Sequence, residues 1–196
     1  MTSDRIAIFI DGTNLTKGLK ELYAIERINV ELLCNHLANG REIVGIYYAE
    51  APYIQNRGIN NFSQQQKYFN EIKKIKGLIF RKGKYSTYST PPVEKLTDVY
   101  LAVDMADLCL KDKFDIAFIV SGDSDLSPAV DVLVREGKRV VIVYFDTAQR
   151  SAYALRKHGG GFFVNITKSL AQKFQWPNPT TSTQLTLEDI KKEPGP

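Results

Sequence analysis

Runs of consecutive apolar residues alternate along the chain with stretches in which apolar residues recur every three or four positions. A continuous apolar run is typical of a strand in a parallel sheet covered on both faces, and the wider spacing is typical of an amphipathic helix. Strands alternating with helices predict an α/β fold with a central, mostly parallel sheet. The predicted strands are residues 5–10, 42–49, 78–82, 115–120, 139–145 and 162–166.

Helical periodicity and capping residues fill the segments between these strands. Asn29 is expected to cap one helix, and Ser127-Pro128 is expected to open another. The predicted helices cover about residues 15–23, 29–39, 62–75, 97–110, 127–137 and 148–157. We therefore expect one domain over residues 1–172. Residues 173–196, which are rich in Pro and Thr, are expected to form a linker and tail in which Thr186 could begin a last short helix.

Length and composition restrict the class of protein. The chain has 196 residues and a net charge of +4, which fits one globular domain and permits a nucleic-acid partner. No apolar run approaches the roughly 18 residues that span a membrane, so neither an anchor nor a signal peptide is expected. Cys34 and Cys109 are far apart and have no neighbouring Cys or His pair. A disulfide framework and a structural zinc site are therefore not expected. A location in the reducing cytoplasm is expected.

Aspartates follow two of the predicted strands directly. Asp11 ends the apolar run at residues 6–10, and Asp123 and Asp125 follow the run at residues 116–120. Because the carboxyl ends of parallel strands border the ligand crevice of an open sheet, we expect these side chains to converge there. Carboxylates that converge repel one another unless a cation offsets their charge, and Mg²⁺ or Mn²⁺ prefers such oxygen ligands.

A fourth acid, Asp98, is expected on the inward side of the helix at 97–110. At 100° per residue, Asp98 shares its side of the helix with Val99, Ala102, Met105 and Cys109. The opposite side carries Tyr100, Asp104, Asp107 and Lys111, so Asp104 and Asp107 are expected to face solvent. A carboxylate on an apolar face needs a charged partner or a metal.

Structural explanations exist for each acid taken alone. Asp11 could shape a turn in which Asn14 caps the next helix, and the helix dipole alone favours Asp98 in a first turn. Asp123 or Asp125 could be an ordinary loop residue. Acids after two strands together with an inward helical acid favour a shared site over these separate explanations. Glu50, also at a strand end, is weighed as a peripheral ligand and not favoured.

Three ordered motifs carry a family resemblance over about residues 4–170. They are Asp11-Gly12-Thr13-Asn14, Lys95-Leu96-Thr97-Asp98 and Ser121-Gly122-Asp123-Ser124-Asp125-Leu126. With Gly137-Lys138-Arg139-Val140 as their continuation, they resemble the NYN domain, specifically the LabA-like branch of the PIN-like nuclease superfamily. The Gly159–Gly161 run departs from the more polar stretch often found there.

The resemblance implies a Rossmann-like (PIN-like) three-layer sandwich, a divalent-metal centre and hydrolysis of RNA phosphodiester bonds. By this match Asp11, Asp98, Asp123 and Asp125 form the acidic site, and Asn14 is its supporting amide. We expect the first three to hold Mg²⁺ or Mn²⁺, with Asp125 completing the shell. Asn14 and Ser121 are expected to orient water or a phosphate oxygen.

Positive charge is concentrated between Lys67 and Lys84, where seven basic residues accompany one acidic residue, Glu71. Two tyrosines, Tyr85 and Tyr88, follow and could stack on unpaired bases. The stretch predicts a surface for single-stranded RNA, or alternatively a solvated helix face and a strand edge protected by lysines. The residues predicted to bind substrate here are Lys73, Lys74, Arg81, Lys82 and Tyr85.

Other classes of protein fit the sequence less well. Haloacid dehalogenase-like phosphatases have Asp-x-Asp-Gly-Thr with the first Asp as nucleophile, and Phe9 occupies that position here. The chain has no phosphate-binding loop of the P-loop type, and His36 and His158 are isolated. The remaining alternative is a catalytically silent module of the same fold that binds RNA or protein. Whether the chain forms a homo-oligomer is left open.

Overall fold

A computed structural model describes residues 4–53, 59–86, 88, 92–145, 155 and 157–177 of the protein. Six strands form one sheet in the order β3-β2-β1-β6-β7-β8, and every neighbouring pair is parallel. These strands are β1 (Ile6–Asp11), β2 (Ile43–Glu50), β3 (Leu78–Lys82), β6 (Ile116–Val120), β7 (Arg139–Phe145) and β8 (Phe163–Ile166). A separate antiparallel hairpin contains β4 (Lys84–Ser86) and β5 (Val93–Lys95).

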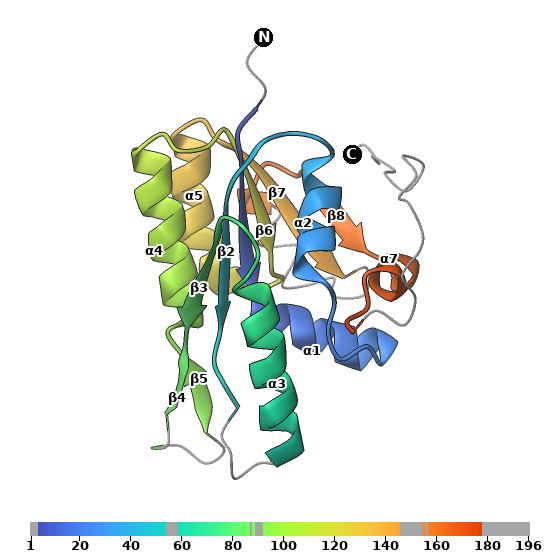
Figure 1. The fold of residues 1–196 in the computed structure, drawn as a ribbon. Helices are drawn as coiled ribbons and strands as arrows, with labels where there is room; N and C mark the ends of the chain where they lie inside the picture. The colour runs from blue at the N-terminus through green and yellow to red at the C-terminus, as the bar shows by residue number, and fades with distance from the viewer. Residues whose placement is uncertain are drawn as a thin grey trace.

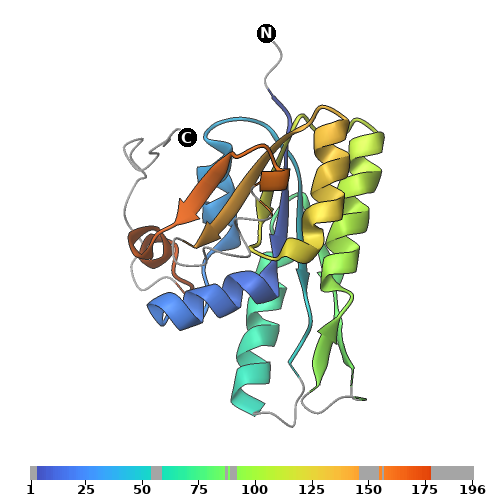
Figure 2. The same ribbon diagram turned by 180° about the vertical axis from the view of Figure 1, so that it is seen from behind.

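Helices cover both faces of the sheet and give the domain three layers (Figure 1, Figure 2). Helices α4 and α5 lie side by side on one face, and α1, α2, α3 and α7 lie on the other. Their bounds are α1 (Gly12–Tyr23), α2 (Val30–Ala38), α3 (Ile59–Ile72), α4 (Thr97–Leu110), α5 (Ser127–Arg135) and α7 (Lys168–Lys173). A single 3-10 turn, η2 (Ser124–Leu126), precedes α5. Within the described residues, no helix is long and apolar enough to cross a membrane.

The chain reverses its direction of travel across the sheet between β1 and β6. From β1 it moves outward to β2 and β3, then returns to β6 on the other side of β1 and continues to β7 and β8. Ligands of open α/β sheets bind outside the carboxyl ends of the strands at such a switch point. The fold therefore directs attention to the residues that follow β1 and β6.

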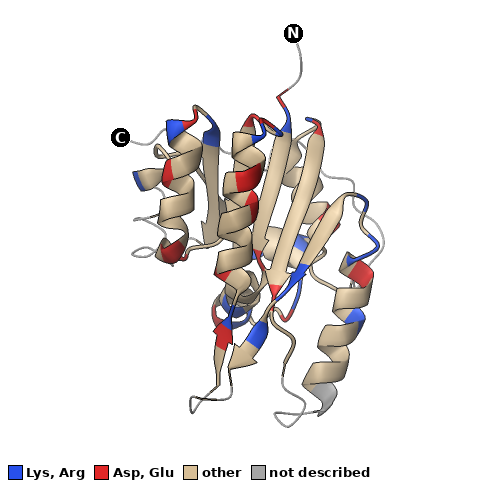
Figure 3. Ribbon diagram, turned by 90° about the vertical axis from the view of Figure 1, so that its left-hand side faces the viewer, with Lys and Arg blue, Asp and Glu red and all other residues tan. Residues whose placement is uncertain are grey.

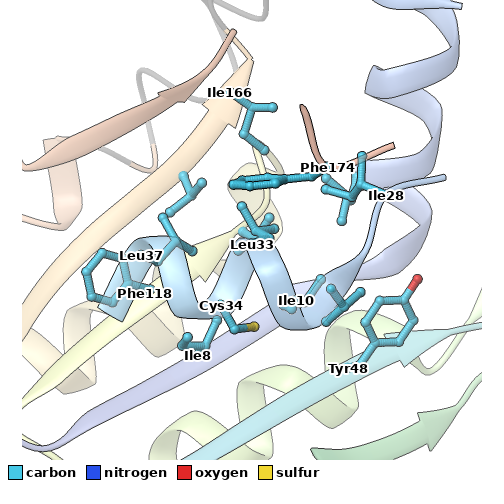
Figure 4. Close-up of a cluster of buried hydrophobic side chains, with 14 of the residues drawn as sticks. Ile8, Ile10, Ile28, Leu33, Cys34, Leu37, Tyr48, Phe118, Ile166 and Phe174 are labelled. Atoms are coloured by element: carbon cyan, nitrogen blue, oxygen red, sulfur yellow. The ribbon is translucent and has the colours of Figure 1, made fainter. Parts of the chain in front are cut away.

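Two apolar clusters hold the layers together, and β1 contributes to both by strand alternation. Ile6, Ile8 and Ile10 belong to the cluster under α1 and α2, which Figure 4 shows around Leu33, Leu37 and Phe174. The intervening residues Ala7 and Phe9 belong to the cluster under α4 and α5. Because β1 is buried on both faces, its sequence is continuously apolar up to Asp11.

The predicted fold class and all six predicted strands are confirmed, each strand within one residue at either end. The hairpin β4–β5 was not predicted, because its three-residue strands are polar and carry no run of apolar residues. The expected helix at 186 lies outside the described residues, as does most of the expected helix at 148–157. The packed structure extends past residue 172: Phe174 is buried, and the partly buried Trp176 packs against the same cluster.

A buried ion pair lies at the carboxyl end of β2. Arg27 donates two hydrogen bonds of 2.8 Å to the two carboxylate oxygens of Glu50. Tyr48 Oη and Gln65 Nε2 also donate to Glu50, at 2.5 and 2.7 Å. The carboxylate thus has four donors, which offset the cost of removing it from water. Arg27 donates further to Thr16 in α1, so this network ties α1 to β2.

Substitution of Glu50 by Ala should lower the free energy of unfolding by about 3–5 kcal/mol, because the buried Arg27 guanidinium would lose its counter-charge. The matched control is Glu26→Ala, which breaks the exposed pair with Lys20 and should cost less than about 1 kcal/mol. Urea denaturation of both variants measures the difference. Equal losses in the two variants would mean that the Arg27–Glu50 pair contributes no more than a surface ion pair.

Candidate metal centre

Asp11, the last residue of β1, is both a helix cap and a buried acid at the switch point. Its Oδ1 accepts a 2.9 Å hydrogen bond from the backbone N–H of Asn14, and this bond makes Asp11 the N-cap of α1. Its Oδ2 accepts a 3.1 Å hydrogen bond from the Ser121 hydroxyl, which follows β6. Gly12 allows this tight turn, because any Cβ there would collide with the ring of Tyr48. The carboxylate is thus held by the first turn of α1 and by the loop after β6.

The loop after β6 is fixed by the same small set of side chains. Ser121 Oγ accepts a 3.1 Å hydrogen bond from the backbone N–H of Asp123. Asn14 Oδ1 accepts one of 3.1 Å from the backbone N–H of Gly122, so α1 is joined directly to this loop. Asn14 is therefore inside α1 and holds the Gly122 loop, and the capping role that was considered for it belongs to Asp11.

Asp98, in the first turn of α4, completes a group of three acids with Asp11 and Asp123. Each of the three offers one carboxylate oxygen, and these oxygens lie within 4.8 Å of one another. Asp11 is buried, while Asp98 and Asp123 are partly exposed. An oxygen-only group of this spacing, open on one side, matches the donors that hard divalent cations take in proteins. We call these three residues the acid group.

Burial and the neighbouring carboxylates make two members of the acid group, Asp11 and Asp98, hard to ionise. Burial raises the pKa of Asp11 to about 7, and the neighbouring Asp98 and Glu94 carboxylates add to this effect. The hydrogen bonds from Asn14 and Ser121 act in the opposite direction. Burial also raises the pKa of Asp98, followed by the charges of Asp123, Glu94 and Asp125. Such a site favours a cation, because a bound positive charge would remove the repulsion.

The structure adds Glu94, in β5, which the sequence analysis did not identify. Its Oε1 accepts hydrogen bonds from Thr13 Oγ1 at 2.8 Å and from the backbone N–H of Ala51 at 3.1 Å. Glu94 therefore connects the hairpin to the first turn of α1 and to the end of β2. The signal in the sequence was its position four residues before Asp98, but its strand was too short to recognise.

Two other acids at this end of the sheet lie outside the acid group. Asp125 is exposed in η2, and its backbone N–H donates a 3.0 Å hydrogen bond to Asp123 Oδ1. Its charge still raises the pKa of Asp98, so it borders the acid group. Glu50, weighed as a peripheral ligand, is instead occupied by Arg27, Tyr48 and Gln65.

The expectation that Asp104 faces solvent is wrong. Asp104 is buried and accepts hydrogen bonds of 2.8 and 2.7 Å from the Arg81 guanidinium, which lies on β3. The buried side of α4 is centred on Leu101 and Met105 rather than on Asp98. This rotation turns Val99 outward, where it is 58% exposed, and turns Asp104 toward β3. The exposed position expected for Asp107 is correct.

The lysines predicted to bind substrate lie near the two ends of β3, in the sheet that Figure 3 shows with lysines and arginines in blue. Lys73 and Lys74 follow α3 and precede β3, at the amino end of the sheet; Lys73 lies over the Phe80 ring and Lys74 pairs with Glu71. Lys82 is exposed at the carboxyl end of β3, beside Glu50 in the register. Tyr85, partly exposed in β4, lies opposite Glu94.

These features define the class of protein: it is an α/β domain with an acid group at the switch point of a Rossmann-like sheet. The NYN domain family matches residues 5–165, so the chain belongs to the NYN domain family. This match agrees with the resemblance carried by the three motifs, and it does not distinguish the LabA-like branch.

The fold has a counterpart among solved structures. A crystal structure of a protein of unknown function from Vibrio parahaemolyticus, VPA0982, aligns with a TM-score of 0.68 at 18% identity, covering 85% of this chain and 94% of that chain. At this identity the likeness shows the fold alone. No curated protein matches the chain.

The raised pKa of Asp11 predicts how stability depends on pH without a metal. A carboxyl whose pKa rises from 3.8 to about 7 on folding binds its proton more tightly in the folded state. Its ionisation therefore destabilises the fold as pH rises from about 4 to about 7, and the loss is complete above that range. We expect Asp11→Asn to lack this loss, so that its stability relative to wild type increases across the window.

Denaturation in EDTA at several pH values measures this difference. The matched control is Asp107→Asn, which removes an exposed carboxylate of α4 outside the acid group and should follow the wild-type curve. Parallel pH dependences for wild type and Asp11→Asn would mean that Asp11 is ionised at its ordinary pKa.

Proposed function

We propose that the protein is a metal-dependent nuclease that hydrolyses phosphodiester bonds, with single-stranded RNA as the favoured substrate. The observation that carries the proposal is the acid group, whose oxygens lie within 4.8 Å of one another at the switch point. Membership of the NYN domain family supports it, because the PIN-like superfamily contains nucleases. The proposal includes the LabA-like branch and a cytoplasmic location.

The acid group fits a divalent cation by its chemistry. Asp11, Asp98 and Asp123 would hold Mg²⁺ or Mn²⁺, and Asp125 would reach it directly or through water. Three carboxylates give an excess of negative charge that a divalent cation offsets, and all the donors are oxygen. When bound, such an ion lowers the pKa of water and offsets the negative charge that develops on phosphorus.

The surrounding residues position the acids and the phosphate. Ser121 donates to Asp11 and accepts from Asp123, so it sets the separation of two members of the acid group. Asn14 Oδ1 is held by Gly122, which leaves its Nδ2 to donate to a phosphate oxygen. We therefore assign Ser121 a positioning role and Asn14 a direct contact with the phosphate. Asp11, Asp98, Asp123 and Asp125 are the proposed catalytic residues.

The proposed RNA path runs from the acid group along β3. Lys82 lies at the carboxyl end of this strand and would contact a phosphate close to the scissile one. Lys73 and Lys74, before the amino end of β3, would contact phosphates farther along the RNA. Tyr85 is proposed to stack on an unpaired base. Arg81 lies between these positions, where its pairing with Asp104 fixes the edge strand.

Cleavage of a generic single-stranded RNA tests the proposed activity. Wild-type protein should cleave it in Mg²⁺ or Mn²⁺ and not in EDTA, and Asp11→Asn should cleave no faster than the EDTA control. The reason is that the substitution removes one of three charges that hold the cation. The control is Asp107→Asn, which removes an exposed carboxylate from the same helix as Asp98 and should retain activity.

Thermal denaturation of the same proteins separates metal binding from catalysis. Mn²⁺ at about 100 times its Kd should stabilise the wild type by about 2.7 kcal/mol, and Asp11→Asn should lose most of this gain. A wild-type protein that neither responds to these metals nor cleaves RNA or DNA would contradict the nuclease proposal. RNA binding without cleavage would then identify a catalytically silent binding module.

Neutralising lysines along β3 tests the proposed RNA path. Each phosphate contact that is lost should lower the slope of log K against log salt by about 0.7 for a single strand. We expect a decrease of about 0.7 for Lys82→Gln and about 1.4 for the Lys73→Gln, Lys74→Gln pair. The second decrease should appear only with RNA long enough to reach the amino end of β3. Arg81 is left intact, because its loss would leave Asp104 buried without a counter-charge. An unchanged slope for either variant would mean that its lysines do not contact RNA and are ordinary solvated surface residues.

A further inference from the structure

Two lysines lie directly opposite each other in the β4–β5 hairpin. The antiparallel register pairs Lys84 with Lys95, and both side chains are exposed. Side chains directly opposite in such a pair have Cβ atoms about 4.5–5.5 Å apart, and like charges in this arrangement destabilise the hairpin. Among the described residues, neither lysine forms a salt bridge with a carboxylate. Water and salt screen the repulsion between these exposed lysines, and a bound anion would reduce it further.

The hairpin determines the face on which these lysines lie. The next register pair is Tyr85 with Glu94, and it lies on the other face of the hairpin. Glu94 on that face is anchored to Thr13 and Ala51, so the lysine pair occupies the outer face. Lys95 is three residues before Asp98, which belongs to the acid group.

The base of the hairpin is also closely packed. The backbone N–H of Gly83 donates a 3.1 Å hydrogen bond to the Glu50 carbonyl at the end of β2. A Cβ at Gly83 would lie 3.0 Å from Thr97 Cγ2 and 3.1 Å from the Lys95 carbonyl oxygen. The chain therefore enters the hairpin between β2 and the start of α4 with no room for a side chain. Because of this packing, the surrounding structure determines where the lysine pair lies.

Electrostatics supplies a reason for cations at this place. The acid group and Glu94 together repel a polyanion, and a divalent cation offsets only part of their charge. Two arginines near this end of the sheet are already engaged, Arg27 with Glu50 and Arg81 with Asp104. Lys84 and Lys95 are exposed cations on the hairpin that carries Glu94 on its other face, and the ammonium group on its flexible stem is well suited to a phosphate oxygen. Figure 1 shows the two strands of this hairpin below α4.

We propose that Lys84 and Lys95 form a paired binding site for the phosphates of the nucleic-acid strand that enters the acid group. The inference rests on the proposed function, because it takes its ligand to be the phosphodiester backbone of the substrate. The two ammonium groups contact phosphates of the strand beyond the acid group and hold the strand across the outer face of the hairpin. Because these contacts are to the backbone, single-stranded RNA and DNA depend on them alike.

The salt dependence of binding tests the site. Binding of a fluorescent single-stranded RNA is measured in EDTA, where metal-dependent cleavage cannot occur, at several salt concentrations. The Lys84→Gln, Lys95→Gln double variant should lower the log–log slope by about 1.4, whereas Lys84→Arg should retain the wild-type slope. The matched control is the double variant Lys113→Gln, Lys157→Gln. It removes two exposed lysines that precede β6 and β8 and should leave the slope unchanged. An unchanged slope in the Lys84, Lys95 variant overturns the proposal.

Thermal stability without nucleic acid is an independent test of the repulsion between Lys84 and Lys95. Lys84→Glu should raise the melting temperature above that of wild type, because it replaces a like-charged cross-strand pair by an opposite-charged one, and it should weaken RNA binding more than Lys84→Gln does. A more stable protein with weakened binding supports the phosphate site. Raised stability with undiminished binding overturns it, since the pair would then be only an unfavourable surface feature.

The outcomes distinguish this site from the nuclease proposal. If wild type binds RNA through Lys84 and Lys95 but never cleaves it in Mg²⁺ or Mn²⁺, the nuclease proposal fails and the phosphate site stands. If wild type cleaves RNA and the slope of log K against log salt is unchanged when both lysines are replaced, the phosphate site fails and the nuclease proposal stands.

Discussion

Three carboxylates are held closer together than their charges favour, and much of this structure acts to keep them there. A buried parallel sheet supplies the rigidity, because β1 and β6 are neighbours and end at the same edge. Burial, together with the charges of the neighbouring carboxylates, raises the pKa values of Asp11 and Asp98. Folding thus creates an unfavourable charge arrangement that a cation would relieve.

Neighbouring acids are kept out of this arrangement by arginines. Arg27 takes Glu50 at the end of β2, and Arg81 takes Asp104 on α4. Both carboxylates are largely buried, and each has an arginine as its counter-charge. The two pairs therefore stabilise the fold, and neither carboxylate belongs to the acid group.

Sequence patterns predicted the parts of the fold in which one physical factor dominates. The six strands were identified because burial on both faces makes them continuously apolar, and Asp11, Asp98 and Asp123 were identified by their places at strand ends and in a helix turn. The orientation of α4 was misjudged, since the apolar side of a helix wheel does not reveal that Arg81, from a distant strand, can bury Asp104. Glu94 was missed for a related reason, because its role depends on Thr13 and Ala51, which only tertiary structure brings near.

Asp11 performs two tasks with one carboxylate, since its Oδ1 accepts the Asn14 N–H that begins α1 and the same carboxylate belongs to the acid group. Any ligand that draws electron density from this carboxylate must weaken the cap, and any change in the first turn of α1 must alter the carboxylate. The backbone amide of Asn14 is therefore a built-in reporter: its proton chemical shift and its exchange with solvent follow the occupancy of the site. Communication between the site and α1 requires no moving domain, only a hydrogen bond shared between a helix and a ligand.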